Sequence, residues 1–239
     1  MQKIKEQLRK KLNDEKQLKV GRLVNRIRSI GSGFNLNKLA IIYGSDKFGG
    51  HEYTPHYMTH LKKFKFKRIK LLEIGVGGYK NPYKGGGSLR MWKKYFPFGK
   101  IFAIDIYDKS NIQERRIKIY QGSQVDKPFL EKILNEIGTP EIIVDDGSHL
   151  NEHVIESFKI LFPRLKSGGV YCVEDTQTSY QESFNGDSKN LDNSLTMMNY
   201  FKTLSDSVNI TEFNTENVSL RDDIKSIHFY HSLIFIHKK

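Results

Sequence analysis

Acidic side chains stand at the carboxyl end of four separate apolar runs of the chain. The acids are Glu73, Asp105, the pair Asp145 and Asp146, and the pair Glu174 and Asp175. If each run is a buried strand of a parallel sheet, these carboxyl ends meet at one edge, where open α/β sheets bind their ligands. The sequence therefore predicts a ligand crevice lined by carboxylates.

The two acidic pairs, residues 145–146 and residues 174–175, converge if their strands are neighbours. Carboxylates at such short range repel one another unless they are protonated or neutralised by a cation. An all-oxygen set selects a hard divalent ion, so we expect Mg²⁺, with Mn²⁺ or Ca²⁺ as alternatives. The competing interpretation is that individual acids only cap the helices that follow them.

A histidine accompanies the pair Asp145 and Asp146, since His149 lies three residues after Asp146. An imidazole titrates near neutral pH and is the commonest general base. A hydroxyl bound to Mg²⁺ loses its proton more readily, and His149 is placed to accept that proton. A structural role for His149 is the alternative, and His153 is the competing candidate for the base.

The first apolar run, residues 69–74, ends in a turn that contains Gly75, Gly77 and Gly78. Glycines allow a tight turn or a close approach of the backbone to a ligand. Ser88 is expected to cap the helix that follows. A strand, a glycine turn and a helix in this order typically open the cofactor crevice of a doubly wound sheet.

The details of this turn argue against a dinucleotide. Lys80 occupies the position where the dinucleotide fingerprint requires a third glycine. Glu73, two residues before the first glycine, would repel a pyrophosphate and suits a ligand with a positive charge or several hydroxyls. Asp105 is placed to accept hydrogen bonds from the ribose hydroxyls of a nucleoside, and a turn-forming role is its alternative.

The remaining chain alternates between strand-like and helix-like patterns. Strands are predicted at 100–105, 117–120, 141–145 and 169–173, weakly at 208–213, and finally at 226–237; helices are predicted at 57–63, 127–137, 151–165 and 195–204. This alternation predicts a mostly parallel sheet covered on both faces, with the last strand antiparallel at or near an edge. Residues 43–57, rich in glycine, aromatics and histidine, are expected to form an ordered wall or lid over the cofactor.

The basic charge belongs mainly to the N-terminal segment. Residues 1–30 carry ten Lys and Arg and three acids, so they contribute +7 of the net charge of +12. Their apolar residues recur at helical spacing, which predicts an amphipathic helix or helix pair with a basic polar face. We predict an appendage at 1–33 and one domain at 34–239. The apolar stripe is expected to pack on this domain or on a sister subunit; an anionic membrane or a nucleic acid is the alternative partner.

The single cysteine, Cys172, excludes a disulfide framework. No run of 18 apolar residues and no signal-peptide pattern is present, so we expect a cytoplasmic protein without a transmembrane segment.

Several motifs together closely resemble the Mg²⁺- and S-adenosylmethionine (SAM)-dependent macrolide-sugar O-methyltransferases of mycinamicin and tylosin type, and similar methyltransferases of surface polysaccharides. The resemblance covers roughly residues 38–239 and rests on the segments 43–47 (YGSDK), 51–57 (HEYTPHY), 72–79 (LEIGVGGY), 85–93 (GGGSLRMWK), 144–149 (VDDGSH), 173–180 (VEDTQTSY) and 227–236 (IHFYHSLIFI).

The resemblance implies a class I SAM-dependent methyltransferase fold, a Rossmann-like, mostly parallel seven-stranded sheet. It implies Mg²⁺ on Asp146, Glu174 and Asp175, with His149 as the base. The expected cofactor contacts are Tyr53, Tyr57, Glu73, Gly75, Gly77, Ser88, Asp105, Gln124, Asp126 and Asp145, with Gln124 and Asp126 near the adenine. Macrolide enzymes of this kind carry a large N-terminal domain where this sequence has its basic segment, so we expect an acceptor other than a macrolide.

We therefore predict methyl transfer from SAM to a hydroxyl of a sugar or sugar-derived metabolite, such as a nucleotide-sugar, in surface-polysaccharide or other glycan or secondary-metabolite biosynthesis. The enzyme is expected to form a homo-oligomer, a dimer or a tetramer. Two alternatives remain at the level of sequence. One is an RNA methyltransferase that uses residues 1–30 as its electrostatic footprint, although the body lacks a basic stripe interleaved with aromatics. The other is a non-catalytic α/β module that docks through that helix.

Overall fold

A computed structural model describes residues 2–212 and 220–239 of the chain. The strands are β1 (Lys70–Ile74), β2 (Lys100–Asp105), β3 (Ile117–Gln121), β4 (Ile142–Asp145), β5 (Val170–Glu174), β6 (Ile224–Tyr230) and β7 (Leu233–Lys238). The α-helices are α1 (Gln2–Arg28), α2 (Leu36–Tyr43), α3 (Tyr53–Leu61), α4 (Gly87–Tyr95), α5 (Lys127–Ile137), α6 (Asn151–Leu161) and α7 (Met197–Thr203). Short 3₁₀ helices are η1 (Lys62–Phe64), η2 (Ser110–Ile112), η3 (Phe162–Arg164), η4 (Thr176–Tyr180), η5 (Glu182–Phe184) and η6 (Leu204–Glu212).

The described strands form one sheet in the order β3-β2-β1-β4-β5-β7-β6. The first five strands in the chain are parallel, and β7 pairs antiparallel with both β5 and β6. The strand order reverses between β1 and β4, so the carboxyl ends of these two neighbours flank the position where open α/β sheets place their ligand. This arrangement confirms the predicted fold class.

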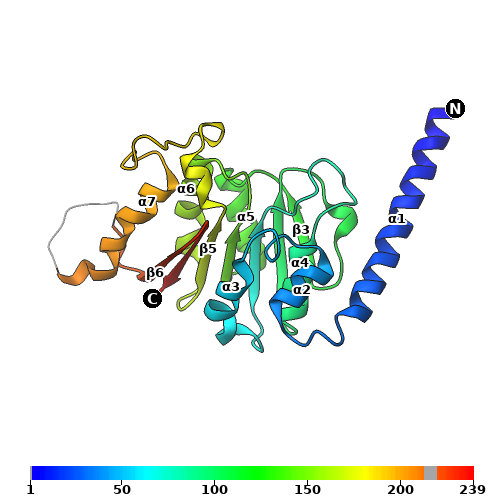
Figure 1. Ribbon diagram of the computed structural model, residues 1–239, viewed down its shortest axis with the longest axis horizontal. Coiled ribbons are helices and arrows are strands. Elements are labelled where there is room, and N and C mark those ends of the chain that lie inside the picture. Colours follow the sequence, from blue (N-terminus) through cyan, green and yellow to red (C-terminus); the bar gives the residue numbers. More distant parts are fainter. Residues whose placement is uncertain (1, 213–219) are drawn as a thin grey trace.

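Each strand alternates its side chains between two hydrophobic cores. Leu71 packs on one face with residues of α2, α3 and α4, whereas Leu72 packs on the other face with residues of α5, α6 and α7. Figure 1 shows these two helical layers in front of and behind the sheet. Apolar side chains thus cover both faces of the sheet. A polar site is therefore expected at the carboxyl edge of the sheet.

Local signals explain the best-predicted helix, α5. The Asp126 side chain accepts a hydrogen bond from the Phe129 backbone, and a proline stands in the first turn. Gly138, with φ of 71°, ends the helix at the predicted position.

Three predictions of local structure were wrong. The expected strand at 226–237 is the hairpin β6–β7, which turns at His231 and Ser232, and Ser232 has φ of 60°. The expected weak strand at 208–213 is the end of η6 as far as Glu212, and residue 213 lies outside the described residues. The cap of α4 is Gly86, not Ser88, because the Ser88 hydroxyl donates to Glu73 Oε2 at 3.1 Å.

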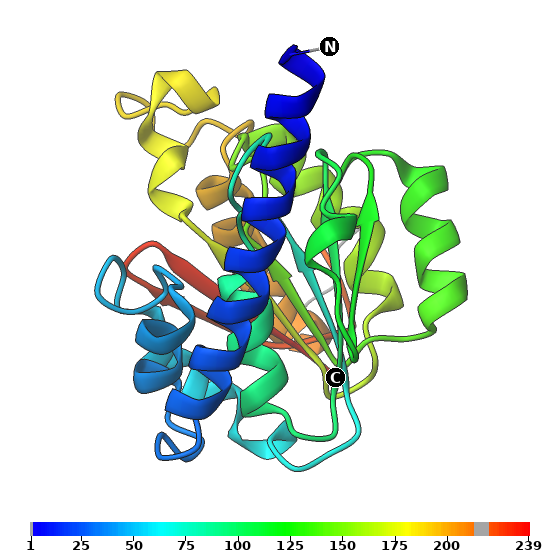
Figure 2. The same ribbon diagram turned by 90° about the vertical axis from the view of Figure 1, so that its right-hand side faces the viewer.

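The first helix, α1, runs along the outside of the domain (Figures 1 and 2), and its N-terminal part extends past the sheet in Figure 2. Leu18 packs against the core, and Arg22 forms an ion pair with Glu114 at 3.6 Å. Ile4 and Leu8, part of the predicted stripe, lie outside the residues whose side chains are described. In the described part of the chain, no helix is both long and apolar enough to cross a membrane.

Candidate active site

A buried lysine lies among the carboxylates at the edge of the sheet. Lys47 Nζ is 2.7 Å from Asp146 Oδ2, 2.7 Å from both carboxylate oxygens of Glu174, and 3.3 Å from Glu73 Oε1. The three acids come from the ends of β1, β4 and β5, which are neighbours in the sheet. The predicted convergence of carboxylates is therefore present, and the cation among them is the ammonium group of Lys47.

The charges of this cluster depend on burial. Burial lowers the pKa of Lys47, but the charges of Asp146, Glu174 and Glu73 outweigh it and hold the pKa well above its usual value. Burial raises the pKa of Glu73 to about 7, against the opposing effect of Lys47. Lys47 therefore stays protonated, and Glu73 takes up a proton near neutral pH, which reduces the repulsion among the acids.

A second group, closer to solvent, consists of Asp146, His149 and Asp175. One nitrogen or oxygen atom from each lies within 4.8 Å of the others. His149 Nε2 is 3.9 Å from Asp146 Oδ1 and 3.5 Å from Asp175 Oδ2. These side chains keep 19–26% of their surface exposed, so the group is open to an incoming ligand.

The backbone is strained at two members of this group. His149 has φ of 58° and Asp175 has φ of 53°, a region that residues other than glycine seldom adopt. Such conformations cost about 1–3 kcal/mol each and cluster at functional sites. Here they turn the imidazole of His149 and the carboxylate of Asp175 toward each other.

The donor set fits a hard divalent cation in part. Asp146 and Asp175 present carboxylate oxygens at the open rim, and Gln177 Oε1 is buried beside Asp175 with no hydrogen-bond partner among the described residues. The third expected ligand, Glu174, lies deeper, where both of its oxygens accept from Lys47 and one also accepts from Tyr57. Asp146 and Asp175 are therefore the residues that could hold the ion directly.

The glycine turn after β1 approaches this rim closely. A Cβ atom on Gly75 would lie 1.9 Å from the backbone oxygen of Asp146, so no other residue fits there. A Cβ on Gly77, whose φ is 73°, would meet no described atom within 4 Å. Gly75 thus joins the turn to the β4 loop, and the surface over Gly77 is open to a ligand.

Asp105 fixes the same turn from the end of β2. Its Oδ2 accepts from the Val76 backbone at 3.0 Å, and its Oδ1 accepts from the Tyr107 backbone at 2.8 Å. The carboxylate therefore lies beside the glycine turn, where it was expected for a ribose contact.

Comparisons with known proteins identify relatives of this chain. The chain is 42% identical over 209 residues to mycinamicin VI 2''-O-methyltransferase of Micromonospora griseorubida, a match that covers 85% of this chain and 52% of the relative. It is 41% identical over 205 residues to 8-demethyl-8-alpha-L-rhamnosyl tetracenomycin-C 2'-O-methyltransferase of Streptomyces olivaceus. This match covers 84% of this chain and 54% of the relative. The chain thus spans about half the length of the curated relatives it matches.

A solved structure supports the same relationship. The MycE methyltransferase from the mycinamycin biosynthetic pathway, in complex with Mg and SAH (S-adenosylhomocysteine), superposes with a TM-score of 0.81 at 41% identity. The superposition covers 85% of this chain and 54% of that one. This chain is homologous to the macrolide-sugar O-methyltransferases. No family model matches the sequence.

Within this methyltransferase fold, three expected cofactor residues have structural partners. Gln124 is buried, and its Nε2 donates to Asp145 Oδ1 and Ser157 Oγ, whereas its Oε1 accepts from the Ser148 backbone. Tyr171 also donates to Asp145, and burial raises the pKa of Asp145 to about 7. Asp126 caps α5. Gln124 and Asp145 thus support the loop that carries Asp146 and His149.

The two tyrosines expected at the cofactor donate instead to the acidic residues. Tyr53 OH donates to Asp175 Oδ1 at 2.7 Å, and Tyr57 OH donates to Glu174 Oε1. Burial raises the pKa of both phenols, so they remain protonated donors. The other histidine considered as the base, His153, is hydrogen-bonded to Ser148 Oγ at 2.9 Å.

Sequence reasoning missed Lys47. It stands in the segment 43–57, which was expected to be a wall or lid, and it is the only lysine or arginine of that segment. The signal that could have found it was the acidic cluster itself, because converging buried carboxylates require a counter-charge and a lysine can supply one as well as a metal ion.

Proposed function

We propose that this protein transfers a methyl group from SAM to a hydroxyl group of a sugar or sugar-derived acceptor, and that it requires Mg²⁺. The observation that carries the proposal is the group Asp146, His149 and Asp175 beside the glycine turn. It occurs in a chain 41% identical to a methyltransferase whose structure holds Mg and SAH. When bound, SAM would supply the electrophilic methyl group, and Mg²⁺ would lower the pKa of the acceptor hydroxyl.

The cofactor would lie over the glycine turn. Gly75 and Gly77 provide the close backbone approach, and Asp105 would accept hydrogen bonds from the ribose hydroxyls. Glu73, with Ser88 bonded to it, lies under the turn at the end of β1. Its carboxylate suits a ligand that carries a sulfonium charge.

The metal would be held by Asp146 and Asp175, with Glu174 behind them. His149 would act at the same rim as the general base, its imidazole taking up the proton of the acceptor hydroxyl. Tyr53 fixes the Asp175 carboxylate, and Lys47 fixes Asp146. These contacts would hold the two carboxylates in place before the reactants bind, which is how a preorganised site lowers a barrier.

The relatives favour a sugar hydroxyl over RNA as the acceptor. The name of one relative specifies a rhamnosyl group on tetracenomycin, and another is a demethylmacrocin O-methyltransferase of Streptomyces fradiae. A nucleotide-sugar, a glycan or a glycosylated metabolite would each present such a hydroxyl.

The buried, unpaired Cys172 is in keeping with a place in the cytoplasm.

The experiment is transfer of a labelled methyl group from SAM to a panel of free sugars, nucleotide-sugars and glycosides, with a structured RNA as a further acceptor. We expect label on a sugar hydroxyl, loss of transfer after EDTA treatment, and recovery with Mg²⁺. Transfer that persists at the full rate in EDTA would refute the metal requirement. Transfer to RNA alone would refute the sugar acceptor.

We also propose that the protein is a homo-oligomer that forms through the first helix. Leu18 faces the domain, whereas a row of apolar side chains on α1 is 43–61% exposed: Leu12, Val20, Leu23, Val24 and Ile27. A second copy of the chain would present the same row, and two such helices side by side would bury both. Lys16 stands within this row, four residues from both Leu12 and Val20, and its ammonium group would have to reach water at the rim of the interface.

The oligomer is tested by light scattering after size-exclusion chromatography. Leu23→Glu and Ile27→Glu should each convert the oligomer into monomers. Arg26→Glu is the control and should not, because Arg26 lies between them in the sequence but does not belong to the apolar row. A wild-type protein that is monomeric at every concentration would refute this interface.

A further inference from the structure

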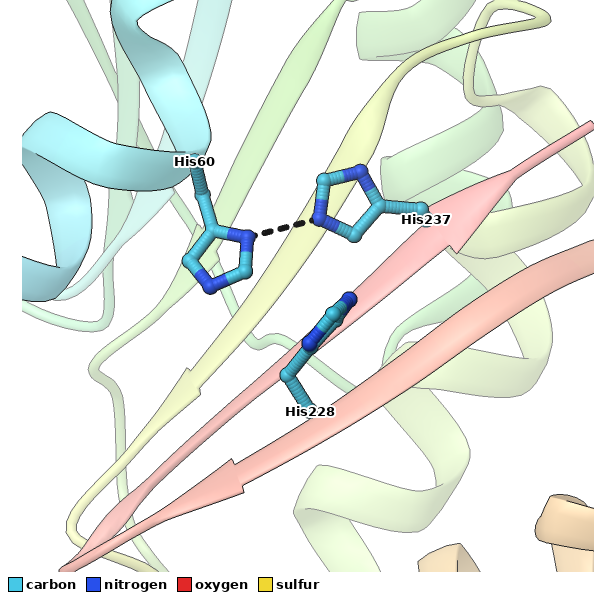
Figure 3. Close-up of side chains that lie close together, drawn as sticks. All are labelled: His60, His228 and His237. Atoms are coloured by element: carbon cyan, nitrogen blue, oxygen red, sulfur yellow. Dashed lines mark hydrogen bonds between the residues drawn. The ribbon is translucent and has the colours of Figure 1, made fainter.

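Three histidines meet at the edge of the sheet opposite the candidate active site. His60 lies in the last turn of α3, His228 lies in β6, and His237 lies in β7. Figure 3 shows the three imidazole rings facing one another across the space between the helix and the hairpin. One ring nitrogen from each lies within 4.8 Å of the others.

This cluster is distinct from the acidic group. In the register of β5 and β7, His237 faces Val170, whereas Leu233 faces Glu174 at the other end of β5. Four residues of strand separate the two ends, which is about 13 Å. The histidines therefore mark the amino edge of the parallel sheet, and Glu174 marks the carboxyl edge.

We propose that His60, His228 and His237 form a binding site for a divalent transition metal of the zinc class, which fastens α3 to the β6–β7 hairpin. Three imidazoles and one open position are a set that Zn²⁺ accepts in tetrahedral geometry. Carboxylate-preferring ions such as Mg²⁺ do not suit an all-nitrogen set.

The spacing of the nitrogen atoms fits this ion. His60 Nδ1 and His237 Nε2 are 2.8 Å apart and share a hydrogen bond. Two nitrogens on one tetrahedral Zn²⁺, each at about 2.0–2.1 Å, lie about 3.3 Å apart. Opening the pair by about 0.5 Å and releasing the shared proton would thus make room for the ion.

The outer contacts of the rings are those of metal-binding histidines. The second nitrogen of His60 lies 2.9 Å from Tyr230 OH, and His228 Nε2 lies 3.0 Å from Ser226 Oγ. Such partners fix the ring orientation and leave the other nitrogen for the metal. His60 also stacks on Phe235, with ring centroids 4.1 Å apart, which further limits its rotation.

The site opens into a pocket of about 680 Å³ with lysines at its rim. These lysines are Lys62, Lys63, Lys225 and Lys238. Two of them are bound to backbone oxygens, since Lys63 donates to the Gly168 carbonyl at 2.7 Å and Lys238 to the Pro163 carbonyl at 2.8 Å. No carboxylate appears among the described residues that line the pocket. The positive rim would therefore favour water or a small anion as the fourth ligand of the ion.

The position of His60 gives the ion a structural role. Tyr57, one turn earlier on α3, donates to Glu174 in the candidate active site. An ion on His60 would hold α3 against the hairpin and so limit the movement of Tyr57. This inference does not depend on the proposed methyl transfer.

The test uses tag-free, full-length protein that has been stripped with EDTA and exchanged into chelator-free buffer. Co²⁺ is titrated because its tetrahedral complexes absorb strongly in the visible range, and Zn²⁺ is then added as a competitor. The variants are His228→Gln, His237→Gln, the exposed control His231→Gln, and the double variant Asp146→Asn/Asp175→Asn, which removes the carboxylate group.

We expect one equivalent of Co²⁺ with a tetrahedral spectrum, displaced by Zn²⁺, in the wild type, in His231→Gln and in the carboxylate double variant. His228→Gln and His237→Gln should each raise the Kd at least about 10-fold, since even residues outside the first coordination sphere cost 10- to 100-fold. Absence of the spectrum in the wild type would overturn the proposal. So would its persistence in both histidine variants or its loss in the carboxylate variant.

Folding of the variants is checked separately by circular dichroism and by Tm in EDTA. A second measurement, which needs no histidine variant, keeps the proposal testable if those variants do not fold. Zn²⁺ should raise the Tm of the carboxylate double variant, and EDTA should reverse the rise. An unchanged Tm at saturating Zn²⁺ would contradict the proposed fastening of α3.

Discussion

Lys47 Nζ lies 2.7 Å from both carboxylate oxygens of Glu174, and neither side chain reaches solvent. The lysine belongs to the segment before α3, and the glutamate ends β5, so this ion pair joins the N-terminal part of the domain to the centre of the sheet. It also occupies the space directly behind the group formed by Asp146, His149 and Asp175. The acidic edge of the sheet therefore has an internal cation.

Replacing Lys47 should destabilise the fold. In Lys47→Met, the carboxylates of Glu174 and Glu73 would lose their buried counter-charge, and breaking a buried pair in this way costs about 3–5 kcal/mol. Urea denaturation of the variant measures this loss. The exposed Lys38→Met is the matched control and should remain near wild type; equal stability of the two variants would show that Lys47 is not the required cation.

His149 should be needed for turnover but not for cofactor binding. Removal of a general base lowers the rate by about 10²- to 10⁴-fold, so we expect His149→Gln to lose that much of kcat while it still binds SAH. The same substitution at His153, which is bonded to Ser148, should have a much smaller effect. If His153→Gln loses more activity than His149→Gln, the two roles must be exchanged.

The histidine cluster should make the metal-free protein sensitive to acid. Burial is the main cause that lowers the pKa of His60 and of His237 to about 4, from an ordinary value of 6.5. Between these values the unfolded chain binds more protons than the folded one, so stability falls as the pH falls from about 6.5 to about 4. The measurement is Tm against pH in EDTA.

The double variant His60→Gln/His237→Gln isolates this effect. It should lose less stability than the wild type over that pH range, whatever its stability at pH 8. Parallel curves for the two proteins would mean that these imidazoles do not control the acid sensitivity.

The sequence predicted those features that arise from local patterns. Asp126, Gly138 and the apolar spacing between them were enough to place α5 at its observed bounds. The convergence of acids at the carboxyl edge also followed, because strand order in a parallel sheet is governed by general rules. The hairpin was missed because the turn residues His231 and Ser232 are not the Asn-Gly or Asp-Gly pair that signals a two-residue hairpin, and the apolar run continues on both sides of them.

Contacts between residues far apart in the sequence could not be predicted from the sequence. Lys47 is separated by 99 residues from Asp146 and by 127 from Glu174. No periodicity links such positions, and a lysine in a glycine-rich segment is ordinarily solvated. The histidine cluster has the same character, since His60 and His237 are 177 residues apart.

The most direct test of the proposed methyltransferase site is calorimetric titration of SAH into the wild type and into Asp105→Asn, with and without Mg²⁺. The wild type should bind saturably. Loss of charged hydrogen bonds to the ribose costs about 1.5–3 kcal/mol, so Asp105→Asn should bind about 10- to 150-fold more weakly. Absence of binding to the wild type in both conditions would contradict the assignment of this crevice to a SAM-dependent reaction.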